Sequence, residues 1–375
     1  MTTFDEDQDR GFLRQAAELA ILGRGFVEPN PTVGAIVVAE GEIRARGWHA
    51  DYGGPHAEPV ALERAGRAAE GATLYVTLEP CCTTGKTPPC TESIVAAGVR
   101  RVVIGALDPN PCHQGRGVAR LEEAGLEVAL LGEPRCEALI APFRRSLGLE
   151  RPYVILKWAM TLDGRIAARD ATSQWISGEH SRQVVHRIRG HVEGVMVGAK
   201  TVAVDDPRLN CRLNDAPLVP ARIVLNPDLS VSPDSTLLQL GTTPDYPVGP
   251  VWIVTHAECD ASRKAALEAA GAEVIELPCD GRDHRLFLRL GLDVFWNRGV
   301  RRLLIEGGSR LLTTAVECGL ADQLVAFVAP TLIGGESALS PLEGEGKPTM
   351  NQAIRLSEVS VRRCGEDAMI MGFFS

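Results

Sequence analysis

Three potential metal ligands lie far apart along this chain and must meet in space if they act together. His56 belongs to the tetrapeptide Pro-His-Ala-Glu at 55–58, Cys81 to Glu-Pro-Cys at 79–81, and Cys90 to Pro-Cys at 89–90. A catalytic zinc site uses three such ligands and leaves the fourth position to water. The sequence therefore predicts a zinc site, and a fold that brings these three segments together.

Glu58 stands two residues after the histidine and is placed to move a proton to or from that water. A His-x-Glu motif followed by Pro-Cys-x-x-Cys is typical of zinc deaminases of nucleobases. Here eight residues separate Cys81 from Cys90, where that pattern has two. The residues still predict hydrolytic deamination of an amino-substituted pyrimidine or purine ring.

Two other interpretations of these residues compete with a catalytic site. A single histidine or cysteine is more often an ordinary buried side chain. A closed structural zinc site would use Cys82 as its fourth ligand. Neighbouring side chains in an extended segment point to opposite sides, so Cys81 and Cys82 share one ion only with unusual backbone geometry. The structural site also leaves Glu58 without a role, and we interpret Cys82 as a bystander.

Bulk properties narrow the class of protein. A chain of 375 residues, 45% hydrophobic and 23% charged, predicts a globular protein of two domains. The net charge of −9 argues against a nucleic-acid surface. The acidic N-terminus lacks the apolar core of a signal peptide, and no apolar run is long enough for a bilayer. The ten cysteines are expected as free thiols in the cytoplasm.

Helical and strand patterns alternate along most of the chain, which predicts an α/β fold with helices covering both sheets. We expect the domain boundary near 144–152 and a final antiparallel pair of strands. In the first half, helices are expected at 11–22, 58–69, 91–97 and 117–124, and strands at 33–39, 72–78, 101–106 and 126–131. In the second half, strands are expected at 153–160, 195–197, 222–225, 251–255, 273–277, 302–305, 324–328, 354–362 and 368–374.

Several motifs occur together, in one order, over nearly the whole chain. They are Pro-Asn-Pro-Thr-Val-Gly at 29–34, Cys-Cys-Thr-Thr-Gly-Lys-Thr-Pro-Pro-Cys at 81–90, Asp-Pro-Asn-Pro at 108–111, Thr-Leu-Asp-Gly-Arg at 161–165, Ser-Gln-Trp-Ile at 173–176, Thr-Val at 201–202, Asp-Asp-Pro at 205–207 and Glu-Gly-Gly at 306–308. The set resembles the bifunctional riboflavin-biosynthesis deaminase/reductase family. The resemblance implies a cytidine-deaminase-like three-layer α/β domain at 1–148 and a dihydrofolate-reductase-like domain at 149–375.

The resemblance also implies two reactions with two cofactors. Zn²⁺-dependent deamination of a diamino-pyrimidinone ribosylamine 5′-phosphate precedes NADPH-dependent reduction of the ribosyl group. Glu58 is expected as the catalytic residue, with His56, Cys81 and Cys90 as zinc ligands. The substrate contacts implied are Asn30, His49, Lys86, Ser173, Arg189, Leu209, Arg212 and Glu306. The cofactor contacts implied are Ala159, Trp175, Thr201, Asp205, Gly308, Ser309, Arg310, Leu311, Leu312, Thr313 and Thr314.

Some of these residues have ordinary interpretations as well. A double glycine between a strand and a helix is often only a turn, and Trp175 is equally compatible with a core position. Arginines such as Arg189 and Arg212 suit a phosphate, although most arginines lie on solvated surfaces. This sequence also departs from the family's common sequence at Pro59, at 112–115 and at Pro227. Because of the last departure, we infer no cofactor contact at Pro227.

Two other functions remain open from the sequence. One is a deaminase of a nucleoside or transfer-RNA base with a non-catalytic second half, and the other is a non-catalytic zinc module. The expected partners are a phosphorylated pyrimidine substrate and further copies of the chain in a homo-oligomer, and neither nucleic acid nor a membrane.

Overall fold

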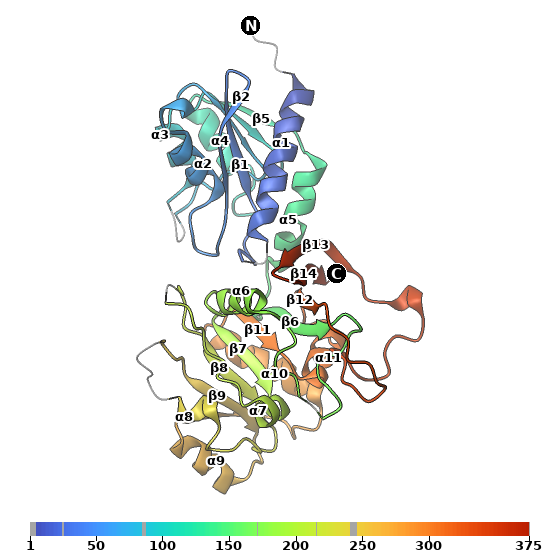
Figure 1. The fold of residues 1–375 in the computed structure, drawn as a ribbon. Helices are drawn as coiled ribbons and strands as arrows, with labels where there is room; N and C mark the ends of the chain where they lie inside the picture. The colour runs from blue at the N-terminus through green and yellow to red at the C-terminus, as the bar shows by residue number, and fades with distance from the viewer. Residues whose placement is uncertain are drawn as a thin grey trace. The chain divides into compact units, whose positions relative to one another are not determined.

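The computed structural model describes residues 5–24, 26–84, 88–170, 172–214, 216–240 and 246–374. The chain divides into two compact units, Met1–Gly148 and Leu149–Ser375. Each unit combines one β-sheet with helices, as predicted for an α/β chain (Figure 1).

The first unit is built on a five-stranded sheet in the order β2-β1-β3-β4-β5. β1 pairs antiparallel with β2 and β3, whereas β3, β4 and β5 are parallel. Its elements are α1 (Glu6–Ala20), β1 (Gly34–Ala39), β2 (Glu42–Trp48), α2 (Ala57–Ala65), β3 (Thr73–Val76), α3 (Cys90–Ala96), β4 (Arg101–Ile104), α4 (Arg116–Glu123), β5 (Glu127–Leu130) and α5 (Pro134–Ser146).

Helices cover both faces of this sheet, which gives the three predicted layers. α1 and α5 lie together on one side, and α2, α3 and α4 lie on the other (Figure 1). Two glycines allow the layers to approach closely. A Cβ at Gly34 would lie 2.1 Å from the Ala16 carbonyl oxygen of α1, and one at Gly47 would lie 2.4 Å from that of Ala57 in α2. Only glycine fits at such backbone contacts.

The second unit is built on a nine-stranded sheet in the order β10-β9-β8-β7-β11-β6-β12-β14-β13. The seven strands from β10 to β12 are parallel, and β14 and β13 add an antiparallel edge, as predicted. Its strands are β6 (Tyr153–Thr161), β7 (Gly194–Gly198), β8 (Ala221–Leu225), β9 (Val251–His256), β10 (Ala272–Leu277), β11 (Arg302–Glu306), β12 (Gln323–Ala329), β13 (Leu356–Cys364) and β14 (Asp367–Phe374).

The helices of the second unit connect its parallel strands. They are α6 (Glu179–Arg189), α7 (Ala199–Asp205), α8 (Thr236–Gln239), α9 (Ala261–Ala269), α10 (His284–Asn297) and α11 (Ser309–Glu317). α10 and α11 supply Phe287, Phe295 and Leu312 to the core on one face of the sheet. Because β11 inserts between β6 and β7, the carboxyl ends of strands that are distant in sequence become neighbours. Within the described residues, no helix combines the length and apolar character needed to cross a bilayer.

Three details of the first unit differ from the sequence-based expectation. α1 begins at Glu6 and not near Gly11, because the Asp5 side chain accepts the N–H groups of Asp7 (3.0 Å) and Gln8 (3.5 Å). β2 was not expected, since its exposed face carries polar residues. α5 was also not expected, and its end at Ser146 lies inside the region 144–152 that was assigned to the boundary.

Gly34→Ala tests the close packing of α1 on β1. We expect the free energy of unfolding of the first unit to fall by about 1–3 kcal/mol or more, because the methyl group meets backbone and not a movable side chain. Gly11→Ala is the matched control within α1. No described atom lies within 4 Å of a Cβ at Gly11, so this change is expected to stabilise by about 0.5–1 kcal/mol. Thermal unfolding of the full chain measures both, and a stabilising Gly34→Ala would contradict the packing argument.

Candidate functional site

The three predicted metal ligands meet where one strand ends and two helices begin. His56 is the residue that caps the N-terminus of α2, and Cys90 is the first residue of α3. Cys81 lies in the segment that follows β3, and its carbonyl oxygen accepts the N–H of Thr91 (3.2 Å). Pro59 falls in the first turn of α2, where its missing N–H breaks no helical hydrogen bond. The local sequence therefore orients each ligand through backbone structure.

The ligand atoms are spaced close to what a tetrahedral zinc site requires. His56 Nδ1 lies 3.2 Å from Cys90 Sγ and 3.6 Å from Cys81 Sγ, and all three atoms lie within 4.8 Å of one another. Zinc bonds of about 2.0 Å to nitrogen and about 2.3 Å to sulfur separate such ligands by about 3.5–3.8 Å. One imidazole and two thiols are also a donor set that zinc prefers. The three residues therefore fit a zinc ion, and Cys82 is not part of the cluster.

The two thiols are electrostatically different. A hydrogen bond from Cys90 and the contact with His56 lower the pKa of Cys81 to about 4. The Cys90 thiol shares its proton with Cys81 and is buried, so its own pKa is raised. The backbone N–H of Cys90 also donates to the Cys81 sulfur (3.3 Å). Cys81 is thus held as a thiolate, the form that binds a metal.

Glu58 lies beside this cluster and is almost fully buried, with 3% of its surface exposed. Burial raises the pKa of its carboxyl group to about 7, although the neighbouring His56 acts in the opposite direction. A hydrogen bond links it to Cys90. A carboxyl group that titrates near neutrality can both accept and return a proton, as a general acid–base group must.

The sequence predicts three substrate contacts in this unit, and the structure describes two of them, His49 and Asn30. His49 is buried, its Nδ1 lies 2.9 Å from the Pro55 oxygen, and its ring meets that of His56 edge-on at 5.3 Å. Burial lowers the pKa of His49, so its ring is neutral; Nδ1 donates to the Pro55 oxygen and Nε2 is left as an acceptor. Asn30 lies in the turn before β1, where its N–H donates to the Val27 oxygen (3.0 Å). Lys86 lies outside the described residues.

A cleft of about 900 Å³ opens in the second unit at the carboxyl ends of its parallel strands. Ligands of open α/β sheets bind at such edges, where the strand order reverses. All but one of the substrate and cofactor contacts expected in this unit line it: Ala159, Ser173, Trp175, Arg189, Thr201, Asp205, Leu209, Arg212, Glu306, Gly308, Ser309, Arg310, Leu311, Leu312 and Thr314. The exception is Thr313, whose hydroxyl accepts the N–H of Glu343 (2.8 Å).

The side of this cleft near α11 suits a phosphate-bearing cofactor. Gly307 and Gly308 both have positive φ, at 84° and 81°. A side chain at Gly308 would be strained there and would crowd Thr201 Oγ1 at 3.3 Å. The first N–H groups of α11 follow directly and are available to an anion. Trp175 is 66% exposed, with the Arg182 guanidinium 4.6 Å from its ring, so it is not a core residue.

Charged residues gather around Glu306, which directly precedes this glycine pair. Arg189 forms a bidentate pair with Glu306 (Nε to Oε1 2.5 Å, Nη2 to Oε2 2.9 Å) and donates to the Asn210 oxygen (2.9 Å). Burial opposes ionisation of Glu306, but the Arg189 charge outweighs it and holds the pKa of Glu306 below its ordinary value. Two of the five guanidinium N–H groups of Arg189 remain for a ligand.

Two further cleft residues were missed by sequence reasoning. Lys157 lies on β6 opposite Glu306, and burial lowers the pKa of its ammonium group. In the sequence, Lys157 is the single charged residue within the apolar run 153–161, and this isolated charge could have identified it. His186 Nε2 lies 3.0 Å from Nε of the exposed Arg212. Burial and the nearby arginines lower the pKa of His186 to about 4, so the ring is neutral and accepts from Arg212.

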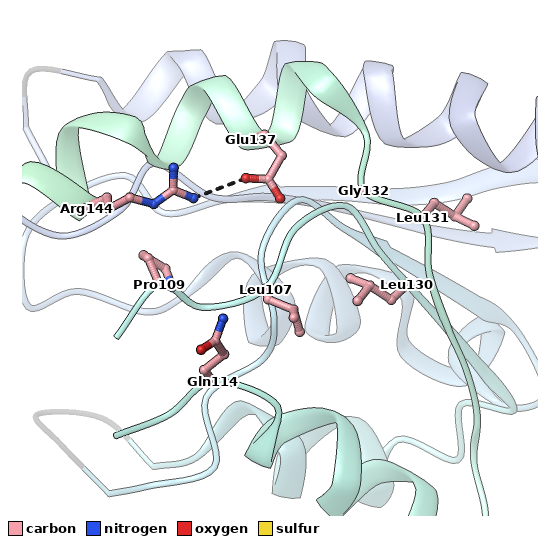
Figure 2. A pocket seen from close by; sticks show the side chains of 8 residues that line it. All are labelled: Leu107, Pro109, Gln114, Leu130, Leu131, Gly132, Glu137 and Arg144. Carbon is pink, nitrogen blue, oxygen red and sulfur yellow. Dashed lines mark hydrogen bonds and ion pairs between the residues drawn. The ribbon is translucent and has the colours of Figure 1, made fainter. Parts of the chain in front are cut away.

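A smaller hollow of about 470 Å³ occurs in the first unit (Figure 2). Leu107, Leu130 and Leu131 form an apolar wall, and Glu137 pairs with Arg144 at 3.2 Å across its rim. Both of these charged side chains are about half exposed. The hollow contains none of the predicted metal or catalytic residues, and the metal cluster remains the candidate site of this unit.

Comparison with known proteins matches both units to described families. Residues 6–106 match the cytidine and deoxycytidylate deaminase zinc-binding region, and residues 152–370 match the RibD C-terminal domain. The riboflavin biosynthesis protein RibD of Aquifex aeolicus is 38% identical over 96% of this chain and 97% of its own. That of Bacillus amyloliquefaciens is 39% identical over 95% of this chain and 94% of its own.

Two solved structures resemble this one over nearly the whole chain. RibD of Acinetobacter baumannii is 33% identical, with a TM-score of 0.68 over 99% of this chain and all of its own. A diaminohydroxyphosphoribosylaminopyrimidine deaminase/5-amino-6-(5-phosphoribosylamino)uracil reductase of Thermotoga maritima is 32% identical, with a TM-score of 0.67 over 98% of this chain and 99% of its own. These matches confirm the predicted fold class of a deaminase-like unit followed by a reductase unit.

Cys90→Ser and Cys82→Ser distinguish a three-ligand catalytic zinc site from a closed, four-ligand structural zinc site. We expect about one zinc per wild-type chain. Cys90→Ser removes a thiolate ligand and is expected to lose the metal, whereas Cys82→Ser is expected to retain it. Elemental analysis of the purified full-length proteins measures both. Loss of zinc from the Cys82 variant would support a closed four-ligand site.

Proposed function

Because this chain belongs to the RibD family of riboflavin biosynthesis proteins, we propose that it catalyses two consecutive reactions. The first is zinc-dependent hydrolytic deamination of 2,5-diamino-6-ribosylamino-4(3H)-pyrimidinone 5′-phosphate. The second is NADPH-dependent reduction of the ribosyl group of the product to a ribityl group. The observation that carries the proposal is the convergence of His56, Cys81 and Cys90 beside the buried Glu58.

We assign the deaminase reaction to residues 1–148 and the reductase reaction to residues 149–375. Two observations support this assignment. The deaminase and reductase family models match 6–106 and 152–370, on either side of the proposed boundary. The chain also separates into two compact units between Gly148 and Leu149.

In the deaminase reaction, Glu58 moves the protons. His56, Cys81 and Cys90 would hold zinc, which would supply an activated water close to the ring carbon that bears the amino group. Glu58 accepts the proton released from that water. It returns this proton to the ring nitrogen and then carries the second proton of the attacking water to the amino group, which departs as ammonia. His49, whose neutral ring lies edge-on to that of His56, is proposed as a substrate contact together with Asn30 and Lys86.

In the reductase reaction, the protein aligns two ligands in one cleft. NADPH supplies the hydride that converts the ribosyl group to ribityl. Gly308 and the first turn of α11 are proposed to hold its phosphates, and Thr201 and Trp175 line the same cleft. The substrate is proposed to lie against Ser173, Leu209 and the Arg189–Glu306 pair, with its phosphate at Arg212. This arrangement supports a phosphorylated pyrimidine as the partner molecule.

Glu58→Gln separates metal binding from proton transfer, because the amide keeps the shape of the side chain but does not exchange the proton. Deamination is expected to fall by about 10²–10⁴-fold or more. Zinc content is expected to stay at the wild-type level. The variant is also expected to oxidise NADPH when given the already deaminated ribosylamine phosphate.

Product mass and NADPH absorbance follow the two reactions separately. Near-normal deamination would remove Glu58 from the mechanism. Loss of the reductase reaction in a folded Glu58→Gln variant would show that the two reactions are not divided between the units as proposed.

Arg212→Ala and Arg189→Ala are expected to differ, although both arginines line the cleft. Arg212 is exposed, and a charged hydrogen bond contributes about 1.5–3 kcal/mol, so Arg212→Ala should weaken use of the phosphorylated substrate by about 10- to 100-fold. A dephosphorylated substrate should be affected little. Arg189→Ala leaves the buried Glu306 carboxylate unpaired and should impair both substrates equally.

Both variants are compared with the wild type on both substrates, at saturating NADPH. An equal penalty for Arg212→Ala on the two substrates would show that Arg212 does not bind the phosphate. A penalty for Arg189→Ala confined to the phosphorylated substrate would show that Arg189 binds phosphate directly.

A further inference from the structure

Glu79 is a buried carboxylate directly before the metal-ligand segment. It follows β3, precedes Pro80 and Cys81, and has 4% of its surface exposed. Four backbone N–H groups donate to its two oxygens. Oε2 accepts from Asp108 (3.1 Å) and Gly115 (2.9 Å), and Oε1 accepts from Gly117 (2.8 Å) and Val118 (3.2 Å). All four donors belong to the segment 108–118, which includes the first residues of α4.

This arrangement satisfies the hydrogen-bonding capacity of the carboxylate. Two ionised oxygens offer about four acceptor positions, and each is occupied by one N–H group. Among the described residues, the charge of Glu79 is met by peptide dipoles and by no cationic side chain. A neutral amide of the same shape would turn one oxygen into an NH₂ group facing two N–H donors. Two of the four hydrogen bonds would then be lost.

The four hydrogen bonds join the segment 108–118 to the segment that holds Cys81. The two segments touch: a Cβ at Gly117 would lie 2.1 Å from the Pro80 carbonyl oxygen and 3.1 Å from Glu79 Oε1. Cys81 itself is fixed on its other side by the N–H groups of Cys90 and Thr91 at the start of α3. The backbone around Cys81 is therefore held between α3 and the segment leading to α4.

We propose that Glu79 is a positioning residue of the deaminase site. Its carboxylate holds the segment 108–118 against the Cys81 segment and so keeps the Cys81 sulfur at its observed distance from His56. Glu79 contacts neither the metal ligands' side-chain atoms nor, in this proposal, the substrate. The inference deepens the proposed deaminase function and rests on it.

Glu79→Gln in the full-length protein tests the proposal. Loss of an outer residue that orients a metal ligand weakens metal affinity or activity by about 10- to 100-fold. We expect zinc affinity, measured by competition with a chelator, to fall within this range. We expect kcat for deamination to fall similarly while KM changes little. The visible spectrum of the cobalt-substituted protein should also change, because a displaced Cys81 alters the geometry around the ion.

Glu133→Gln is the matched control. Glu133 is equally buried, with 2% of its side chain exposed, but its carboxylate pairs with Arg10 (3.4 Å) and Arg14 (3.3 Å) on α1. This variant is expected to lose stability while zinc affinity, the cobalt spectrum and deamination stay at wild-type values. NADPH oxidation in the second unit should be unchanged in both variants. If Glu79→Gln also keeps wild-type zinc affinity and spectrum, or if the two variants behave alike, the proposal is wrong.

Gly117→Ala tests the same contact with Glu79 intact, should Glu79→Gln fail to fold. The added methyl group pushes the segment 108–118 away from Pro80, and the same loss of zinc affinity is expected. Wild-type zinc affinity in a folded Gly117→Ala variant would overturn the proposal, as would unfolding of the first unit in both variants. The zinc and cobalt measurements need no substrate. Absence of turnover in the wild type would therefore count against the proposed function and not against the role of Glu79.

Discussion

Parallel strands leave all their carboxyl ends on one edge of a sheet, and both candidate sites of this protein depend on that constraint. In the first unit, Cys81 follows β3, and the segment 108–118 follows the neighbouring β4. In the second unit, the cleft is formed after β6, β7, β8 and β11. Helices begin at the same edges, so unpaired N–H groups gather where anions, thiolates and carboxylates are needed. Residues that are far apart in sequence become neighbours for this reason.

Buried charged side chains are stabilised in three different ways in this molecule. Arg101 forms a two-point pair with Asp9 (2.9 and 2.7 Å), and the Tyr75 hydroxyl adds a third hydrogen bond (2.7 Å). Glu79 is neutralised by peptide N–H groups alone. In the cleft, Arg189 pairs with Glu306. Among the described residues that line the cleft, seven are cationic (Lys157, Arg182, Arg189, Lys200, Arg208, Arg212 and Arg310) and five carry carboxylates (Asp205, Asp206, Asp228, Glu306 and Glu343), so cations exceed anions there. A local positive field in a chain of net charge −9 is the environment that a phosphorylated substrate requires.

Sequence reasoning succeeded where a short motif carries its own backbone geometry. The His-Ala-Glu motif begins a helix, and Cys90 begins another; His56, Cys81 and Cys90 cluster as expected, and their role as zinc ligands stays a prediction. Sequence reasoning did not predict β2 or α5. Their sequences mix polar and apolar residues, so the face that is buried can be recognised only when the packing against the sheet and α1 is known. Sequence reasoning also missed Glu79 and Lys157. Their importance comes from partners 29 to 149 positions away, and no local pattern reports such contacts.

The sequence alone determined which chemical groups this protein has available: one imidazole and two thiols for zinc, a carboxylate for proton transfer, and a glycine pair before a helix. These follow from residue type and short spacing, which fix donor atoms and local backbone conformation. Only the tertiary structure decided which of these groups meet, how far burial shifts their pKa values, and which arginine is already paired. Distances, desolvation and hydrogen-bond partners depend on the packing of segments that are separated in sequence, and the order of residues does not encode them locally.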